Sequence, residues 1–372
     1  MKGKIIKNSD NINTKIREIL ESLISKQIFD AVFVPVRVPT GESFTYLLIK
    51  DKNILKDCIP LPPIMSVQGA RAFKDLTRLG KLKYKILCVM RPCEIRAMIE
   101  LSKLRQVTLE DVSFLSLDCP GVYQTADYII EPEKYDKSFS SLLEKWEPEG
   151  LRPNCRVCNH FSNQEINSDL HIGFYDQSLI LVPLTKKGEE IFTSLGFEST
   201  DDLADWENRK NELLRRREEI RNKTFTELHN QTNGMEGLEN FFKGCINCHN
   251  CMRVCPICYC RQCFFESTDQ LRRESEDYLI RTEKKGGIRF PVDRMLFHLG
   301  RMTHMSLSCV GCGVCEDGCP MDIPVGQIFN FIGDEVQKMF EYLPGRDKDE
   351  PIPVLTYKED ELHEYEDAQE TK

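Results

Sequence analysis

The sequence predicts two domains: an α/β or α+β domain, followed by a helical domain that is rich in cysteine. Three observations support this division of the 372 residues. Residues 1–198 alternate between strand-like and helix-like patterns, as expected where helices pack on a sheet. Residues 199–235 are strongly charged and have helical periodicity. Eleven of the 17 cysteines lie between Cys245 and Cys319, in a domain that we bound at residues 236–343.

The first domain is predicted to alternate helices with strands. Apolar residues recur three or four positions apart in the predicted helices, which span residues 16–29, 93–104 and 186–197. Runs rich in β-branched and aromatic residues predict strands at residues 30–38, 84–90, 111–119, 169–176 and 178–185. This order of elements predicts a sheet with helices packed against it.

Residues 199–235 are predicted to form a charged helical linker between the domains. Its apolar stripe consists of Leu203, Trp206, Leu213 and Ile220. Acidic residues at its beginning suit the positive end of the helix dipole. We interpret the arginine run at residues 215–217 as a solvated face.

Residues 344–372 are acidic and interrupted by proline. A segment of this composition has little apolar surface to bury. We therefore predict an extended tail that becomes ordered only against a partner.

The overall composition excludes several classes of protein. The chain is 41% hydrophobic and 29% charged, which is typical of a globular protein. A net charge of -9 argues against a nucleic-acid-binding protein, whose binding surface is basic. No apolar run is long enough to span a bilayer, and the N-terminus lacks the apolar region of a signal peptide. We therefore expect a cytoplasmic protein without membrane insertion.

The large number of cysteines indicates metal binding, because disulfides are rare in the reducing cytosol. Residues 245–256 hold four cysteines in the spacing C-x2-C-x2-C-x3-C followed by proline, and residues 309–320 repeat it. This doubled pattern is typical of two 4Fe–4S clusters, with the fourth cysteine of each run binding the other cluster. We predict one cluster on Cys245, Cys248, Cys251 and Cys319. The other is predicted on Cys309, Cys312, Cys315 and Cys255.

Zinc is the alternative to iron–sulfur clusters, because paired C-x2-C motifs also occur in zinc ribbons. A ribbon, however, gives no reason for a doubled pattern of eight cysteines. The last cysteine of the first run and the first of the second are 54 positions apart, and the connection contains helix-like stretches at residues 269–285 and 291–305. It resembles the α-helical ferredoxin domain of heterodisulfide reductase and succinate dehydrogenase iron–sulfur subunits. For His298 and His304, on the second stretch, we predict packing or solvation rather than ligation.

Three cysteines of the same stretch remain outside the two sets: Cys258, Cys260 and Cys263. Three thiolates do not complete a cluster, so a further cluster would need a fourth ligand such as Cys58 or Cys88. The alternative is that they are small buried side chains beside the clusters.

The first domain holds four more cysteines that could meet around one metal centre: Cys93, Cys119, Cys155 and Cys158. Cys93 and Cys119 each follow a predicted strand. Ligand sites of α/β proteins normally lie where strands end. These four cysteines by themselves fit either a zinc ion or a 4Fe–4S cluster.

Residues 80–197 resemble a known family. The motifs are Pro92-Cys93, Cys119-Pro120-Gly121, the pair Cys155 and Cys158, and "SDLHIG" at residues 168–173. They are similar to motifs in the β subunits of the hydrogenase and formate dehydrogenase that use coenzyme F-420, a deazaflavin. The family's glycine-rich N-terminal element has no clear counterpart here.

The resemblance implies a third 4Fe–4S cluster, on Cys93, Cys119, Cys155 and Cys158. It also implies FAD beside that cluster, exchanging hydride with the deazaflavin. Arg91 stands where a lysine is expected in the family, and it is a candidate for contact with an FAD phosphate.

We therefore expect an iron–sulfur electron-transfer subunit of an anaerobic oxidoreductase complex. Electrons would pass between a flavin or deazaflavin site in residues 1–198 and a partner such as formate dehydrogenase, hydrogenase or heterodisulfide reductase. A pure relay, without flavin or a substrate of its own, is the alternative. A zinc-stabilised scaffold is a third interpretation.

Overall fold

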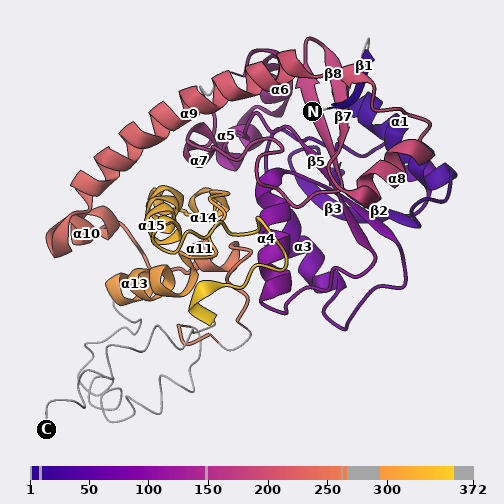
Figure 1. Ribbon diagram of the computed structural model, residues 1–372. Helices are drawn as coiled ribbons and strands as arrows, with labels where there is room; N and C mark the ends of the chain where they lie inside the picture. The colour runs from indigo at the N-terminus through magenta and orange to yellow at the C-terminus, as the bar shows by residue number, and fades with distance from the viewer. Residues whose placement is uncertain (1, 8–10, 147–149, 261–262, 266–293, 356–372) are drawn as a thin grey trace, which may run out of the picture.

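The computed structural model describes residues 2–7, 11–146, 150–260, 263–265 and 294–355. Its strands form one eight-stranded mixed sheet in the order β3-β2-β4-β5-β6-β7-β1-β8 (Figure 1). Strands β2, β4, β5 and β6 run parallel, and the other neighbours are antiparallel. The strands are β1 (Lys2–Lys7), β2 (Ala31–Arg37), β3 (Phe44–Ile49), β4 (Ile86–Met90), β5 (Val112–Leu117), β6 (Leu170–Tyr175), β7 (Ser178–Pro183) and β8 (Asp201–Asp202). The predicted α/β or α+β class is confirmed.

Helices surround the sheet and make up the C-terminal region. Those of the sheet domain are α1 (Ile12–Ser25), α2 (Lys52–Leu55), α3 (Gly69–Leu76), α4 (Pro92–Lys103), α5 (Thr125–Ile130), α6 (Pro132–Lys145), α7 (Pro153–Arg156) and α8 (Lys186–Ser194). The later ones are α9 (Ala204–Gln231), α10 (Gly234–Phe242), α11 (Asn250–Arg253), α13 (Arg294–Met305), α14 (Val314–Asp317), α15 (Val325–Met339) and the 3-10 helix η1 (Pro353–Leu355). Across the described residues, a helix with the length and apolarity needed to cross a bilayer is not found.

The sheet separates two hydrophobic cores. Side chains of a strand alternate between its two faces. Val32 and Val34 of β2 therefore pack in the core that contains α1. Phe33, between them, packs in the core that contains α3 and α4. This second core continues into the C-terminal helices, where it includes Phe242 of α10 and Phe297 of α13.

Helix α4 lies between the sheet and the C-terminal region (Figure 1). It is buried on all sides, so that even Glu94, Arg96 and Glu100 are inside the protein. Each of these polar side chains has a partner, as burial of a charge requires. Glu94 accepts from the Gly69 amide at 2.8 Å, and Arg96 Nε donates to a carbonyl of the C-terminal segment, Pro344 O, at 2.8 Å. The helix thus ties the two regions together.

Helix α9 is the long helix that runs from the sheet to the C-terminal region (Figure 1). Trp206 is buried against Gly173, where an added Cβ would lie 2.5 Å from the indole ring. Arg215 and Arg216 are exposed, as the solvated interpretation of this run expects. For Arg217 that interpretation is wrong, because the side chain is 3% exposed and donates to Pro120 O at 2.7 Å.

Several other predictions differ from the structure in detail. The first helix begins at Ile12 and ends at Ser25, earlier than the predicted 16–29. Strands β1 and β3 were not predicted from the sequence. The helix-like stretch at 269–285 lies outside the described residues, whereas 291–305 contains α13.

The beginning of the predicted tail is packed within the chain itself. Residues 344–355 are described, and Ile352 is 6% exposed. The Gly345 amide donates to Glu100 of α4 at 2.8 Å. The prediction that the tail becomes ordered only against a partner is therefore wrong for residues 344–355.

Candidate metal centres

The two cysteine runs form two loops with the same backbone conformation. Two positions after the first cysteine, each run has a residue of positive φ, Asn247 at 55° and Gly311 at 66°. One position after the second cysteine, each has another, His249 at 60° and Gly313 at 72°. His249 and Gly313 are the N-cap residues of the short helices α11 and α14, which carry the third cysteines. Equal spacing thus gives equal backbone geometry.

The first predicted ligand set lines one cavity. The cavity is bounded by Cys245, Cys248, Cys251 and Cys319, together with Phe297 and His298. Cys319 belongs to the second run, yet it joins the three thiols of the first. Repulsion from Cys319 also contributes to the raised pKa of Cys251, about 11, although burial is the larger cause.

The second predicted set also comes together. Burial raises the pKa values of Cys309, Cys312 and Cys315, and repulsion from Cys255 raises them further. A negative charge on Cys255 acts on all three only because its thiol lies near theirs. The arrangement therefore supports the predicted exchange of fourth ligands between the runs.

The N-terminal cysteines meet at the carboxyl ends of two parallel strands. Cys93 lies in the first turn of α4, directly after β4, and Cys119 follows β5. Cys119 N donates to Phe161 O at 2.7 Å. Gly121, at a φ of 123°, lets the chain approach Cys155, since an added Cβ would lie 3.0 Å from Cys155 Cβ.

All four of these thiols line one cavity: Cys93, Cys119, Cys155 and Cys158. Cys312, from the second run of the C-terminal region, lines the same cavity. Burial raises the pKa of Cys119 to about 11 and that of Cys93 well above its ordinary value. Thiols in such a place bind metal only as thiolates, so a bound cationic centre would be needed to deprotonate them.

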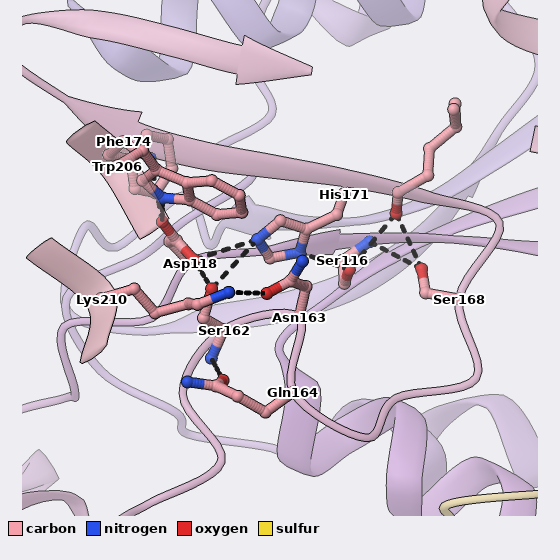
Figure 2. Close-up of polar contacts among 11 residues, drawn as sticks. Ser116, Asp118, Ser162, Asn163, Gln164, Ser168, His171, Phe174, Trp206 and Lys210 are labelled. Carbon is pink, nitrogen blue, oxygen red and sulfur yellow. Dashed lines mark hydrogen bonds and ion pairs between the residues drawn. The ribbon is translucent and has the colours of Figure 1, made fainter. Parts of the chain in front are cut away.

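A buried polar network supports the turn that carries Cys119 (Figure 2). Asp118 accepts from Trp206 Nε1 at 2.8 Å and from the Phe174 amide at 3.0 Å. His171 places one ring nitrogen 3.0 Å from Asp118 Oδ1 and the other 2.7 Å from Ser116 Oγ. This network was not predicted from the sequence. An aspartate directly before Cys119, at the end of a buried strand, was the available signal.

Buried arginines bind the loops that carry the cysteines, another feature that the sequence analysis missed. Arg152 donates to Cys312 O at 3.0 Å and to Asp317 Oδ2 at 2.6 Å. Arg217 donates to Cys158 O at 3.4 Å. These contacts fix the loops of both regions with respect to each other.

Arg91, the candidate flavin contact, lies in the interior. The residue is 2% exposed and lines the cavity of the four N-terminal thiols. It donates to Pro62 O, and its Nη1 lies 3.8 Å from Glu94 Oε2. The contact between Arg91 and a flavin stays a prediction.

The remaining cysteines are dispersed. Cys260 is exposed, Cys258 Sγ lies 3.8 Å from Met305 Sδ, and Cys263 Sγ lies 3.7 Å from Met252 Sδ. Cys58 packs in the core on the α1 side of the sheet, whereas Cys258 and Cys263 pack at the other core. Cys88 is buried in β4, and burial alone raises the pKa of its thiol. Neither Cys58 nor Cys88 is brought to the three as a fourth ligand, which corrects that suggestion.

His298 and His304 behave differently from each other. His298 stacks on Phe242 at 3.9 Å, with Nε2 at 3.4 Å from Cys245 Sγ. Burial lowers its pKa to about 3, so the ring is neutral. His304 is exposed. His298 is thus packed in the interior, and His304 is solvated.

The donor chemistry fits iron–sulfur clusters. Each of the three sets supplies four thiols, the usual ligand number of a 4Fe–4S cluster. Within the described ranges, no three His, Cys, Asp or Glu side chains form a group that could hold a single metal ion. A 4Fe–4S cluster does not need several ligands on one metal ion, because each of its four thiolates binds a different iron.

Comparison with known proteins agrees with these sites. Residues 241–323 match the family model described as a 4Fe-4S dicluster domain. This range contains all eight cysteines of the two runs.

Two curated relatives match most of the chain. One is the F420-dependent formate dehydrogenase subunit beta of Methanocaldococcus jannaschii, 27% identical over 318 residues, with 74% of this chain and 79% of the relative covered. The other is the F420-dependent formate dehydrogenase 1 subunit beta of Methanococcus maripaludis, 27% identical over 312 residues, with 73% and 75% covered. The predicted resemblance is confirmed. This chain resembles the β subunits of such oxidoreductases.

A solved structure is also similar. It is described as a xenon derivative of the F420-reducing [NiFe] hydrogenase complex from Methanosarcina barkeri. The TM-score is 0.45 at 13% sequence identity, with 63% of this chain and 94% of that chain covered.

Proposed function

We propose that the chain is a cytoplasmic iron–sulfur electron-transfer subunit of an oxidoreductase complex. The resemblance to formate dehydrogenase β subunits and the dicluster match support this proposal. The chain supplies three sets of four thiols, for three 4Fe–4S clusters. Bound clusters of this kind transfer single electrons at a potential that the surrounding protein sets.

The observation that carries the proposal is the position of Cys312. This residue belongs to the second predicted set, yet it lines the cavity of Cys93, Cys119, Cys155 and Cys158. The Cys255 set therefore adjoins the N-terminal site on one side. On the other side it adjoins the first set through the two exchanged ligands. We infer a linear order, with the Cys255 set in the middle.

The ends of this order define the partners that we propose. The relatives named above are F420-dependent, so we place exchange with a flavin or deazaflavin at the N-terminal domain. At the other end we place a redox subunit such as formate dehydrogenase, hydrogenase or heterodisulfide reductase. A pure relay without flavin is the second candidate. It is favoured by the internal partners of Arg91.

Iron and sulfide analysis tests the three sets. The full chain, purified without oxygen, should hold about twelve irons, four for each cluster. About eight would remove the N-terminal cluster, and about sixteen would add one at Cys258, Cys260 and Cys263. Cys93→Ser should lower the value to about eight. Cys88→Ala, five residues away in the adjoining strand, is the matched control and should leave it unchanged.

The flavin is tested separately. Acid extraction of the purified complex, followed by fluorescence, should release FAD, and Arg91→Ala should lower the yield. If flavin is absent or comes entirely from another subunit, the relay is the correct function.

A further inference from the structure

Arg301 places a buried positive charge beside the first cluster site of the C-terminal region. It lies on α13, and its side chain is 2% exposed. Among the described residues no aspartate or glutamate forms an ion pair with it. A buried guanidinium needs hydrogen-bond acceptors or negative charge close by.

Three of its partner atoms are sulfurs, from Cys251, Cys258 and Met305. Nη1 lies 3.1 Å from Cys251 Sγ, and Nη2 lies 3.3 Å from Cys251 O. Nη2 also lies 3.8 Å from Cys258 Sγ and 3.3 Å from Met305 Sδ. The guanidinium stacks over the Phe329 ring, 4.6 Å from its centroid. Its N–H groups therefore point at a predicted cluster ligand, and aromatic rings keep water away.

The contacts place this charge at the first predicted set. Cys251, whose Sγ and carbonyl oxygen Arg301 contacts, is a predicted ligand of that set. The guanidinium therefore lies within hydrogen-bond distance of one of the two C-terminal cluster sites.

We propose that Arg301 sets the reduction potential of the C-terminal cluster that Cys251 binds. This inference rests on the proposed function. Reduction adds one electron to a cluster that is already negative with its thiolates. A buried cation and N–H···S hydrogen bonds favour the more negative form, and hydrogen bonds to sulfur are a known determinant of cluster potential.

The same contacts explain the position of Cys258 without a fourth cluster. Its thiol lies beside the guanidinium and Met305. We therefore expect that Cys258→Ala keeps the iron content of the chain.

The test is a potentiometric titration of the full, iron-loaded chain, followed by electron paramagnetic resonance. Arg301→Gln should lower the potential of the Cys251 cluster. We expect about a tenfold change in the equilibrium between oxidised and reduced forms, which is about 59 mV for one electron. Arg301→Lys keeps the charge but loses the two-pronged contact, so a smaller shift in the same direction is expected.

Arg294→Gln is the matched control, because Arg294 lies on the same helix and is exposed. It removes the same charge, yet water and salt screen that position, so its shift should be smaller than that of Arg301→Gln. Unchanged potentials in an Arg301→Gln chain of full iron content would overturn the inference while leaving the proposed function intact. If that variant loses iron, Arg301→Lys decides, and wild-type potentials or loss of iron there would overturn it. A wild-type chain that takes up no iron would instead overturn the proposed function.

Discussion

The two cysteine runs share a spacing and a backbone but differ in what they touch. In the first run, residues of positive φ are Asn247 and His249, and in the second they are Gly311 and Gly313. His249 stacks on Phe297 at 4.1 Å. Gly313 has no such room, because an added Cβ would lie 2.8 Å from Asn154 Cβ.

The difference teaches where each run is docked. Asn154 belongs to α7 of the sheet domain, so the second run lies against that domain. The first run contacts that domain at its last cysteine, where Cys255 O accepts from Arg71 Nη1 of α3 at 3.3 Å, but its Ile246 is 59% exposed. Spacing sets the loop geometry, while the residues between the cysteines set what the loop packs against.

The largest expected effect concerns the ligand that crosses from one run to the other. Cys319→Ser should disrupt the first cluster, because its fourth ligand comes from the second run. Iron should fall from about twelve to about eight per chain, measured with sulfide after anaerobic purification. Cys260→Ser, at an exposed cysteine, is the control and should keep the full content. Loss of the Cys309 cluster instead would show that each run binds its own.

The next effect compares Asp317 with Arg253, which occupy the same position in the two runs. Asp317 Oδ2 pairs with Arg152 at 2.6 Å, and their side chains are 7% and 1% exposed. Asp317→Asn leaves the Arg152 charge buried without its counter-charge, which should cost about 3 to 5 kcal/mol of unfolding free energy. Denaturant unfolding of the loaded chain measures it.

Arg253 is exposed, so Arg253→Gln should change the same free energy by less than about 0.5 kcal/mol. Equal effects of the two substitutions would contradict the unequal docking of the runs.

A smaller effect is expected at the left-handed positions. Gly313→Ala adds a Cβ where φ is 72° and where Asn154 and Arg152 Cδ lie within 2.9 Å. Strain and overpacking together should cost about 2 to 4 kcal/mol. His249→Ala loses only a ring stack, about 0.5 to 1.5 kcal/mol. The comparison fails if thermal or denaturant unfolding ranks them in the reverse order.

Among the left-handed positions, the smallest effect is expected for Asn247→Gly, which makes the first run resemble the second. Glycine relieves the positive φ of 55°, but the contact of Asn247 Oδ1 with His249 Nε2 at 3.1 Å is lost. Asparagine tolerates this region, so the net change should be below about 1 kcal/mol. A loss of several kcal/mol on unfolding would mean that the side chain itself holds the loop.

Local patterns in the sequence were enough to predict several elements of the fold. The buried strands β4 and β5 and helix α4 were predicted because short apolar runs and helical periodicity are local signals. The four-residue strand pairing of β1 with β7 was missed, because "KGKIIK" is short and lysine-rich and its partner follows more than 170 positions later.

The candidate sites were predictable only where spacing encodes them. The eight cysteines of the runs follow a fixed pattern, so their grouping could be proposed from the sequence. The network around Asp118 could not, because His171 and Trp206 lie 53 and 88 positions away. Arg217 was interpreted as solvated for the same reason, since its carbonyl partners come from Pro120 and Cys158.

The most direct test of the account is an anomalous difference map at the iron edge, from crystals of the loaded chain. We predict three groups of four irons. The middle group should be bound by Cys255, Cys309, Cys312 and Cys315, and it should lie between the N-terminal group and the group that Cys319 completes. A map in which Cys255 shares an iron core with Cys245, or in which the N-terminal thiols hold no iron, would contradict it.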